Sequence, residues 1–369
     1  MPRRKDLDGL RGVAVLLTIS LHYIFRSGFF PPVGSPHLAQ LLDSAWAGVD
    51  IFFVLSGFLI GGIILDHGHV DGFLRAFYLR RALRILPVVS IAIAFSYLVL
   101  PLLNPSVLWS AQVPPWAYLL FINNFWTALG RHSFSPLGPL WSLAIEEQFY
   151  LVAPMLLLSL PTKARTTLLV ATILISPCLR LWHGAWSSWD FTLYRLDGLA
   201  AGLLMADVVR KPVFDVFAAR HRRAIAGAVV GLVAVSLWFA SSSNFSDTQR
   251  LAYGIWLNSL ATAGIVVFLQ ATTGSFLSNL LSGSWLLAFG RYSYFLYLLH
   301  MPILFYVLAA FDSVPPAYAV ILAFIVTFAG AAASWRFLES RAIALGKNYP
   351  YTKPPPGING AVTFATNES

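Results

Sequence analysis

Long apolar runs follow one another along almost the whole chain, and they restrict the fold more than any other feature. A transmembrane helix needs about 20 apolar residues to cross roughly 30 Å of hydrocarbon. The breaks between the runs are short, and 57% of the residues are hydrophobic while only 11% are charged. We therefore expect an all-α polytopic membrane protein with about ten transmembrane helices. The runs lie near 9–26, 44–65, 84–103, 143–160, 166–182, 191–209, 224–241, 251–271, 285–308 and 317–338.

Lysine and arginine predict the orientation of these helices, because cytoplasmic loops carry an excess of both residues. Ten spans with a cytoplasmic N-terminus place most of the 25 Lys and Arg residues inside, including the basic stretch 210–223. A further crossing at 116–129 would invert every later loop, so this segment is expected to be re-entrant or surface-lying. Both termini are predicted to be cytoplasmic, with one integral domain at 1–344 and a tail at 345–369 that is expected to be disordered.

Composition also argues against two kinds of partner. The net charge of +9 is explained by the inner loops, whereas a nucleic-acid site would cluster its basic residues in one groove among aromatic residues. The lone Cys178 excludes a disulfide within the chain and a cysteine-built metal site. His67 and His69 share a glycine-containing turn in which no helix fixes the spacing of ligands. We therefore expect neither a nucleic acid nor a metal.

Arg11 and His22 are the first candidates for function. They are eleven residues apart in the first apolar run, which is about three helical turns, so both project from one helix face roughly 16 Å apart. An ionisable side chain inside a membrane helix is costly and marks a functional site by default. The alternative is a histidine that only bonds to a neighbouring helix.

Asp50 is expected at the same depth as His22, a few residues inside the outer end of the second run. A carboxylate bonded to one imidazole nitrogen fixes the tautomer and leaves the other nitrogen to accept a proton. Asp50 and His22 are thus predicted to form a general base. A purely structural buried pair remains the alternative.

Basic residues also cluster in the stretch that leads into the third run. Arg81 and Arg84 are three residues apart, so a helix presents them, with Arg80, as one cationic patch at the inner surface. The planar guanidinium group suits phosphate. Charges that only set the orientation of the protein would show the same spacing.

Glu146 and Glu147 are adjacent at the outer start of the fourth run, and their side chains point about 100° apart on a helix. Only one of them is therefore expected to act on a given atom. Arg195 and Asp197 either form a structural ion pair or line the same cavity. His300, in the middle of a span, is interpreted as a packing or hydrogen-bonded histidine.

Five blocks of sequence together resemble the membrane-bound acyltransferase 3 family. Arg11 and His22 match its Arg-x10-His opening, Arg81 and Arg84 match its Arg-x-x-Arg segment, and the similarity spans residues 5 to 341. The other matching blocks are Gly48-Val49-Asp50-Ile51-Phe52-Phe53-Val54-Leu55-Ser56-Gly57-Phe58, Ser142-x-x-x-Glu146, and Gly290-Arg291-Tyr292-Ser293-Tyr294-Phe295-Leu296-Tyr297-Leu298-Leu299-His300. One block alone carries little weight, but five in order are specific.

This resemblance implies an O-acyltransferase that moves an acyl group from cytoplasmic acyl-CoA, usually acetyl-CoA, to a hydroxyl of a carbohydrate across the cell membrane. Arg81 and Arg84, assisted by Arg11, would hold the nucleotide phosphates. His22, oriented by Asp50, would deprotonate the acceptor or carry the acyl group itself.

The resemblance also implies where the acceptor lies. Glu146 would position it, with Trp141, Ser142 and Arg195 as further contacts. Tryptophans dense near the outer ends are either an interfacial belt or stacking platforms for sugars. Many relatives carry a fused extracytoplasmic hydrolase-like domain, and this chain is expected to be a form without one that acts directly or with a separate partner.

A proton-coupled transporter of an acyl donor or sugar conjugate is the alternative function. His22 and Asp50 would then form a proton relay. Secondary transporters commonly contain repeated halves, and the sequence shows no such repeat. The enzyme is therefore favoured.

Overall fold

The computed structural model describes residues 4–25, 36–103, 113–128, 135–184, 189–242, 244–311 and 313–351. Within these ranges every regular element is a helix, which confirms the all-α class. Eight helical stretches there are long and apolar enough to cross a membrane. They are Lys5–Ile24, Ala39–His67, Phe73–Leu102, Thr162–His183, Val213–Ser241, Asp247–Ala271, Ser284–Ala310 and Pro316–Gly346.

Two of the expected spans differ from this set. The run 143–160 corresponds to α9 (Leu140–Ser159), which carries two glutamates and is not among the eight. The run 191–209 contains α11 (Leu196–Val208), whose 13 residues extend only about 20 Å, less than the hydrocarbon thickness. Most of α11 is buried among other helices. Its apolar sequence therefore reflects burial in protein, a signal that hydropathy does not separate from burial in lipid.

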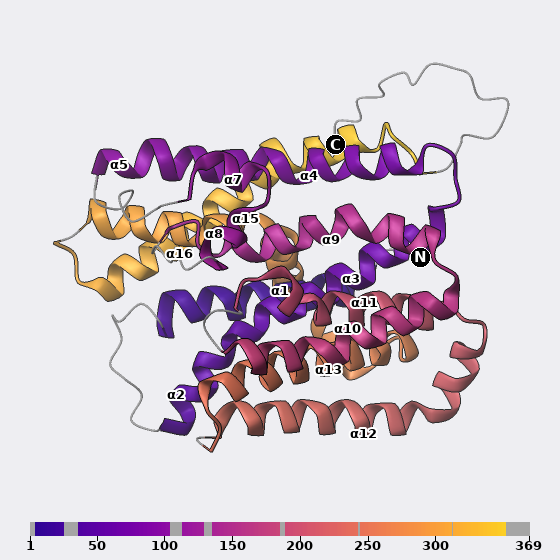
Figure 1. The fold of residues 1–369 in the computed structure, drawn as a ribbon. Helices are drawn as coiled ribbons and strands as arrows, with labels where there is room; N and C mark the ends of the chain where they lie inside the picture. Colours follow the sequence, from indigo (N-terminus) through magenta and orange to yellow (C-terminus); the bar gives the residue numbers. More distant parts are fainter. Residues whose placement is uncertain are drawn as a thin grey trace.

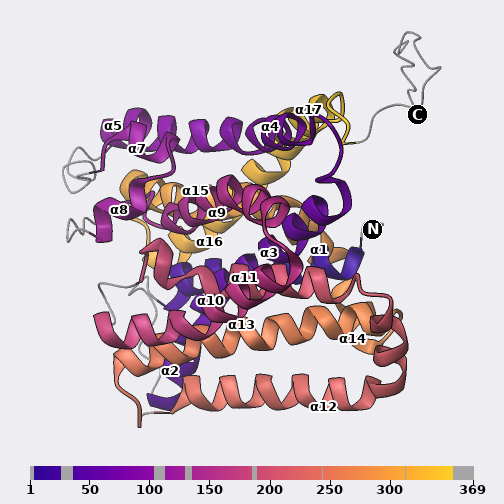
Figure 2. The ribbon, with the colours of Figure 1, turned by 45° about the vertical axis from the view of Figure 1, so that its right-hand side comes forward.

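The helix bundle has α3 (Ala47–His67) and α11 near its centre, with α4 (Phe73–Ala94) along one side and α12 (Val213–Ser241) along the opposite side (Figures 1 and 2). Helices α3 and α11 approach so closely that a Cβ atom on Gly57 would lie 2.1 Å from the Leu199 carbonyl oxygen. On α11, a Cβ on Gly202 would lie 2.0 Å from the Val54 oxygen. Glycine allows this contact, as is common between membrane helices.

Helix α1 (Lys5–Ser20) packs against α15 (Ser284–Ala310) in the same way. A Cβ atom on Gly12 would lie 2.3 Å from the Leu286 oxygen, and one on Gly290 would lie 1.9 Å from the Asp8 oxygen. Both glycines belong to blocks of sequence singled out above. Helix α1 continues into a π-helical turn, η1 (Leu21–Phe25), which carries His22.

The segment expected to be re-entrant or surface-lying forms two short helices, α7 (Pro115–Leu119) and α8 (Asn123–Ala128). Asn124 is fully buried, and its side-chain nitrogen donates to Thr192 Oγ1 at 2.9 Å. Its oxygen accepts from Gln148 Nε2 at 2.9 Å. These bonds join the segment to α9 and to η4, so this irregular backbone is covered by protein, where it is tolerated.

The predicted tail begins as helix. Residues 345 and 346 end α17, which packs against the start of α4. The Arg80 guanidinium carbon then lies 4.2 Å from the centre of the Tyr351 ring. Residues 352–369 lie outside the described part of the chain. The elements whose bounds have not yet been given are α2 (Pro36–Asp43), η2 (Ser44–Trp46), η3 (Phe95–Val99), α5 (Leu100–Leu103), α10 (Thr162–His183), η4 (Thr192–Tyr194), α13 (Asp247–Ala271), α14 (Phe276–Leu281), α16 (Pro316–Ser334), η5 (Trp335–Glu339) and α17 (Ser340–Gly346).

Candidate active site

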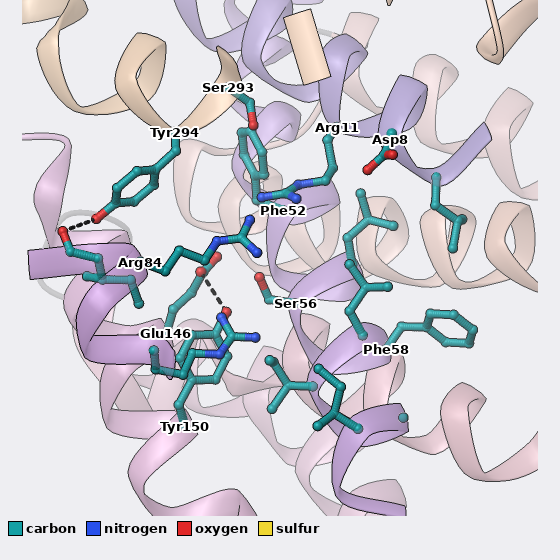
Figure 3. Close-up of a pocket in the computed structure, with 18 of the residues that line it drawn as sticks. Asp8, Arg11, Phe52, Ser56, Phe58, Arg84, Glu146, Tyr150, Ser293 and Tyr294 are labelled. Atoms are coloured by element: carbon teal, nitrogen blue, oxygen red, sulfur yellow. Dashed lines mark hydrogen bonds between the residues drawn. The ribbon is translucent and has the colours of Figure 1, made fainter. Parts of the chain in front are cut away.

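A cavity of about 400 Å³ lies between α1, α3, α4, α9 and α15, which is within the usual size of a ligand pocket. Figure 3 shows side chains from these helices converging on it. Arg4 and His67 line one end, where α1 begins and α3 finishes. Ser142 and Tyr297 also belong to the lining and come from α9 and α15. The cavity therefore extends along the helices rather than sitting at one surface.

Five arginines among the described residues line this cavity; Arg4 and Arg210 form ion pairs with aspartates, and the other three are Arg11 from α1 and Arg81 and Arg84 from α4. Figure 3 shows Arg11 and Arg84 pointing into the cavity. The Arg81 guanidinium carbon lies 4.6 Å from the centre of the Tyr150 ring. Among the described residues, none of the three guanidinium groups makes a hydrogen bond or an ion pair within 4.0 Å. Buried charges normally have partners, so three cations at one cavity suit an anionic ligand. Arg80, by contrast, contacts Tyr351.

Acidic side chains come to the same cavity from α9. Tyr150 donates its hydroxyl hydrogen to Glu146 Oε2 at 2.9 Å (Figure 3). Glu147 also lines the cavity. Glu147 Oε1 is buried without a hydrogen-bond partner in the described structure. Glu146, which was predicted to position the acceptor, thus lies in the cavity that holds the arginines.

Ser142 and Tyr297 form a polar contact in the cavity wall. Ser142 Oγ lies 2.6 Å from the Tyr297 hydroxyl oxygen, and that hydroxyl donates to the Pro139 carbonyl at 3.0 Å. Phe52 lies edge-on to Tyr297. The centres of the Tyr297 and His300 rings are 6.1 Å apart, so His300 lies next to this part of the cavity wall.

His22 contacts His300 and not Asp50. The ring centres of the two histidines are 5.0 Å apart, and His22 Nδ1 lies 3.2 Å from His300 Nε2. The same His22 nitrogen lies 2.9 Å from the Thr18 carbonyl oxygen. The expectation that Asp50 orients His22 is wrong for the described structure, because the Asp50 carboxylate bonds elsewhere.

Asp50 forms a buried ion pair with Arg195, whose Nη2 lies 2.9 Å from Asp50 Oδ1. Asn258 donates to the other carboxylate oxygen at 3.3 Å. Both charged side chains are at most 1% exposed. Arg195 and Asp197 were interpreted either as an ion pair or as residues of one cavity; Asp197 instead pairs with Arg180, with Nη2 and Oδ2 2.7 Å apart. Four buried charges therefore form two ion pairs around α11.

Aromatic rings enclose Arg195. Its guanidinium carbon lies 5.2 Å from the centre of the Trp141 ring, 5.3 Å from that of Trp189 and 5.5 Å from that of Phe53. Trp189 and Trp46 also line a second cavity, of about 430 Å³, together with Asp43, Asp247 and Arg250. Of the residues expected to contact an acceptor, Glu146 and Ser142 line the cavity that holds Arg11, Arg81 and Arg84, while Trp141 and Arg195 pack against one another outside it.

Fold and site together define a multi-pass membrane protein that encloses an arginine-lined cavity near two hydrogen-bonded histidines, of which His300 is buried and His22 partly buried. A family model described as an acyltransferase domain matches residues 4–336, so the chain belongs to the acyltransferase 3 family. The resemblance stated from the sequence is thereby confirmed.

Two curated proteins are similar to this chain over most of its length. The chain is 28% identical over 361 residues to the peptidoglycan O-acetyltransferase OatA of Listeria monocytogenes, covering 91% of this chain and 55% of the relative. It is also 28% identical over 357 residues to the O-acetyltransferase OatA of Staphylococcus aureus, covering 90% and 56%. The chain thus spans about half the length of the curated relatives it matches. No solved structure matches it.

The sequence analysis did not predict that Tyr297 lines the cavity or that His300 contacts His22. Tyr297 and His300 were both inside a quoted block, yet His300 was interpreted only as a packing or hydrogen-bonded residue. It is hydrogen-bonded as expected, but its partner is His22. Tyr297 and His300 are three residues apart on α15, so the helical period places them on one face. That spacing was the signal available in the sequence.

Proposed function

We propose that this protein transfers an acyl group, usually acetyl, from cytoplasmic acyl-CoA to a hydroxyl of a glycan on the other side of the cell membrane. The observation that carries the proposal is the convergence of Arg11, Arg81 and Arg84 on one cavity, where none of them forms an ion pair within 4.0 Å with a described residue although Glu146 and Glu147 line the same cavity. Membership of an acyltransferase family supports the reaction type. The relatives' names support O-acetyl transfer and, for one, a peptidoglycan acceptor.

The phosphates of acyl-CoA would bind at the arginines, because a guanidinium fork matches the geometry of phosphate oxygens. Tyr150, which contacts Arg81 and donates to Glu146, would help to keep these side chains in place. The acyl-pantetheine arm would then run past Ser142 and Tyr297 towards His22. Such a path fits a cavity that runs along the helices.

In the transfer step, the acceptor hydroxyl attacks the thioester carbonyl carbon while His22 takes the hydroxyl proton. The carbon–sulfur bond breaks as the new carbon–oxygen bond forms. The thiolate that leaves is protonated by His22, so free CoA and the ester are the products. No metal is required. Glu146 would interact with the acceptor or with the bound donor from the cavity wall.

The acceptor is proposed to be a polysaccharide or glycolipid that approaches from the outer side. Ser142 is the acceptor-binding candidate that lines the arginine cavity, with Trp141 and Arg195 behind it. A separate extracytoplasmic partner that receives the acyl group is a second route to the same product. The end of the bundle that holds Arg4 and His67 would face the cytoplasm, in agreement with the excess of basic residues in inner loops.

The test compares Arg84→Ala with Arg80→Ala, a matched control whose guanidinium group contacts Tyr351 outside the cavity. A hydrogen bond to a charged group contributes about 1.5–3 kcal/mol, so Arg84→Ala should weaken CoA binding roughly 10- to 150-fold. Binding is measured by calorimetry on purified protein. Equal weakening in both variants, or none in either, contradicts the proposed donor site.

Acyl transfer is measured in liposomes that contain labelled acetyl-CoA and, on the opposite side, peptidoglycan fragments. Labelled ester on the fragments is the expected product, and His22→Ala should lower the rate of its formation about 10²- to 10⁴-fold, to a residual rate that is still measurable. If intact acetyl-CoA or a sugar conjugate crosses the membrane without any ester being formed, the transporter hypothesis replaces the enzyme.

A further inference from the structure

We infer that His300 is the positioning residue of His22: it selects the tautomer of the His22 imidazole that carries its lone pair on Nε2. This inference rests on the proposed role of His22 in acyl transfer. It gives His300 the part that the sequence suggested for Asp50. The two histidines come from α15 and from the π-helical turn after α1. Such turns are rare and occur frequently at functional sites.

The hydrogen bonds of His300 determine where its proton lies. Its Nδ1 is 2.8 Å from the Tyr297 carbonyl oxygen, which only accepts, so Nδ1 carries the hydrogen. In a neutral imidazole the other nitrogen is then an acceptor. His300 is fully buried, with 0% exposure, which favours the neutral ring. His300 Nε2 therefore presents a lone pair to His22.

The same reasoning applies to His22. Its Nδ1 lies 2.9 Å from the Thr18 carbonyl oxygen and 3.2 Å from His300 Nε2, and both of these atoms are acceptors. His22 Nδ1 must therefore carry a hydrogen, which the two acceptors share. The lone pair of neutral His22 is then on Nε2, the nitrogen that would take the proton of the acceptor hydroxyl. After that transfer, the same two acceptors stabilise the positive ring.

The surroundings hold His300 in this position. Tyr23 donates its hydroxyl hydrogen to the His300 carbonyl oxygen at 2.6 Å, and its oxygen lies 3.0 Å from Thr327 Oγ1. Tyr23 follows His22 directly in η1, so the turn that presents His22 also ties down the backbone of its partner. The arrangement corresponds to the orienting acid of a hydrolase triad, with a neutral imidazole in place of a carboxylate.

Two variants of similar size separate the two ring nitrogens of His300. His300→Gln can place an amide oxygen where Nε2 accepts from His22, whereas His300→Asn reaches only the Nδ1 position. We expect His300→Asn to lower kcat for acyl transfer at least about 10-fold, since general-base catalysis contributes 10²- to 10⁴-fold. His300→Gln should stay within about threefold of the unmodified protein. The KM for acetyl-CoA should change by less than about twofold in both, because the arginines are untouched.

The combination with His22→Ala tests whether His300 acts through His22. His300→Asn should cause no further loss of transfer in that background. A further loss, or equal rates for the Asn and Gln variants and the unmodified protein, overturns the inference. If the unmodified protein transfers no acyl group at all, the proposed function fails instead, so the two failures are distinguishable.

A spectroscopic measurement on the unmodified protein does not depend on activity. Nitrogen NMR of labelled histidine reports which ring nitrogen carries hydrogen, and His22→Asn assigns the His22 signals by their absence. The expected result is hydrogen on Nδ1 of neutral His22. Hydrogen on Nε2, or an even mixture of tautomers, overturns the inference.

Discussion

The buried pair of Asp50 and Arg195 gives a prediction that decides between a structural and a catalytic role for Asp50. Asp50→Asn removes the anion and leaves the Arg195 guanidinium group enclosed by Phe53, Trp141 and Trp189. Nε and Nη1 of Arg195 already lack hydrogen-bond partners in the described structure, so no second acceptor replaces the carboxylate. Breaking a fully buried ion pair costs about 3–5 kcal/mol.

The double variant Asp50→Leu with Arg195→Met tests the same ion pair more sharply, because its stability is compared with that of each single variant. Replacing both charges with apolar side chains is often neutral or stabilising, so it should cost less than either single change. Unfolding in mixed detergent micelles, followed by tryptophan fluorescence, gives the free energies. Asp247→Asn is the control, because the side chain of Asp247 is 69% exposed in its pair with Arg250, and exposed pairs contribute little.

Two results would refute this reasoning. The first is that Asp50→Asn unfolds like the control, which would mean that the pair contributes nothing to the fold. The second is that Asp50→Asn keeps its stability but loses acyl transfer with a changed pH profile. Asp50 would then act on His22 despite its bonds to Arg195 and Asn258.

Two further predictions concern close packing and the C-terminal contact. Gly12→Ala should destabilise the protein and lower acyl transfer, because the new Cβ would lie 2.3 Å from the Leu286 oxygen. The control is Gly227→Ala, which has open space around it and should be neutral or stabilise α12 by about 0.5–1 kcal/mol. Equal unfolding curves for the two variants would contradict the close approach of α1 and α15. Tyr351→Ala removes the ring beside Arg80 and should cost only about 0.5–1 kcal/mol while increasing protease cleavage after Gly346, and an unchanged cleavage rate would show that Tyr351 does not hold this segment.

The helical class and most membrane helices could be predicted from the sequence, because hydropathy over about 20 residues directly measures the cost of crossing a bilayer. It did not separate α11, a 13-residue helix that is mostly buried by neighbouring helices, from a full span. It also left 116–129 open. Buried bonds of Asn124 and Gln148 explain that segment, and they join residues far apart in the chain.

The candidate site was predictable where one helix carries all the information. Helical spacing predicted one patch of Arg80, Arg81 and Arg84; Arg81 and Arg84 line one cavity, whereas Arg80 contacts Tyr351. Depth in the membrane, however, did not predict the partner of His22. Two residues at one depth on neighbouring helices meet only if both helices are rotated towards each other, and the sequence contains no direct measure of that rotation. Asp50 instead meets Arg195 of α11 and Asn258 of α13.

The contact between α1 and α15 explains how Arg11 and His22 come to lie beside residues that are far away in the sequence. Gly12 and Gly290 bring the two backbones together, and this fixes both the rotation of α1 and its position along α15. Arg11 then faces the cavity while His22, about 16 Å further along the axis, meets His300. The same helix, α1 with its continuation η1, would therefore set the distance between the donor phosphates at Arg11 and the base His22. A shift of α1 along α15 would disturb phosphate binding and the histidine pair together, so Gly12→Ala should raise the KM for acetyl-CoA and lower kcat, whereas His300→Asn should lower kcat alone.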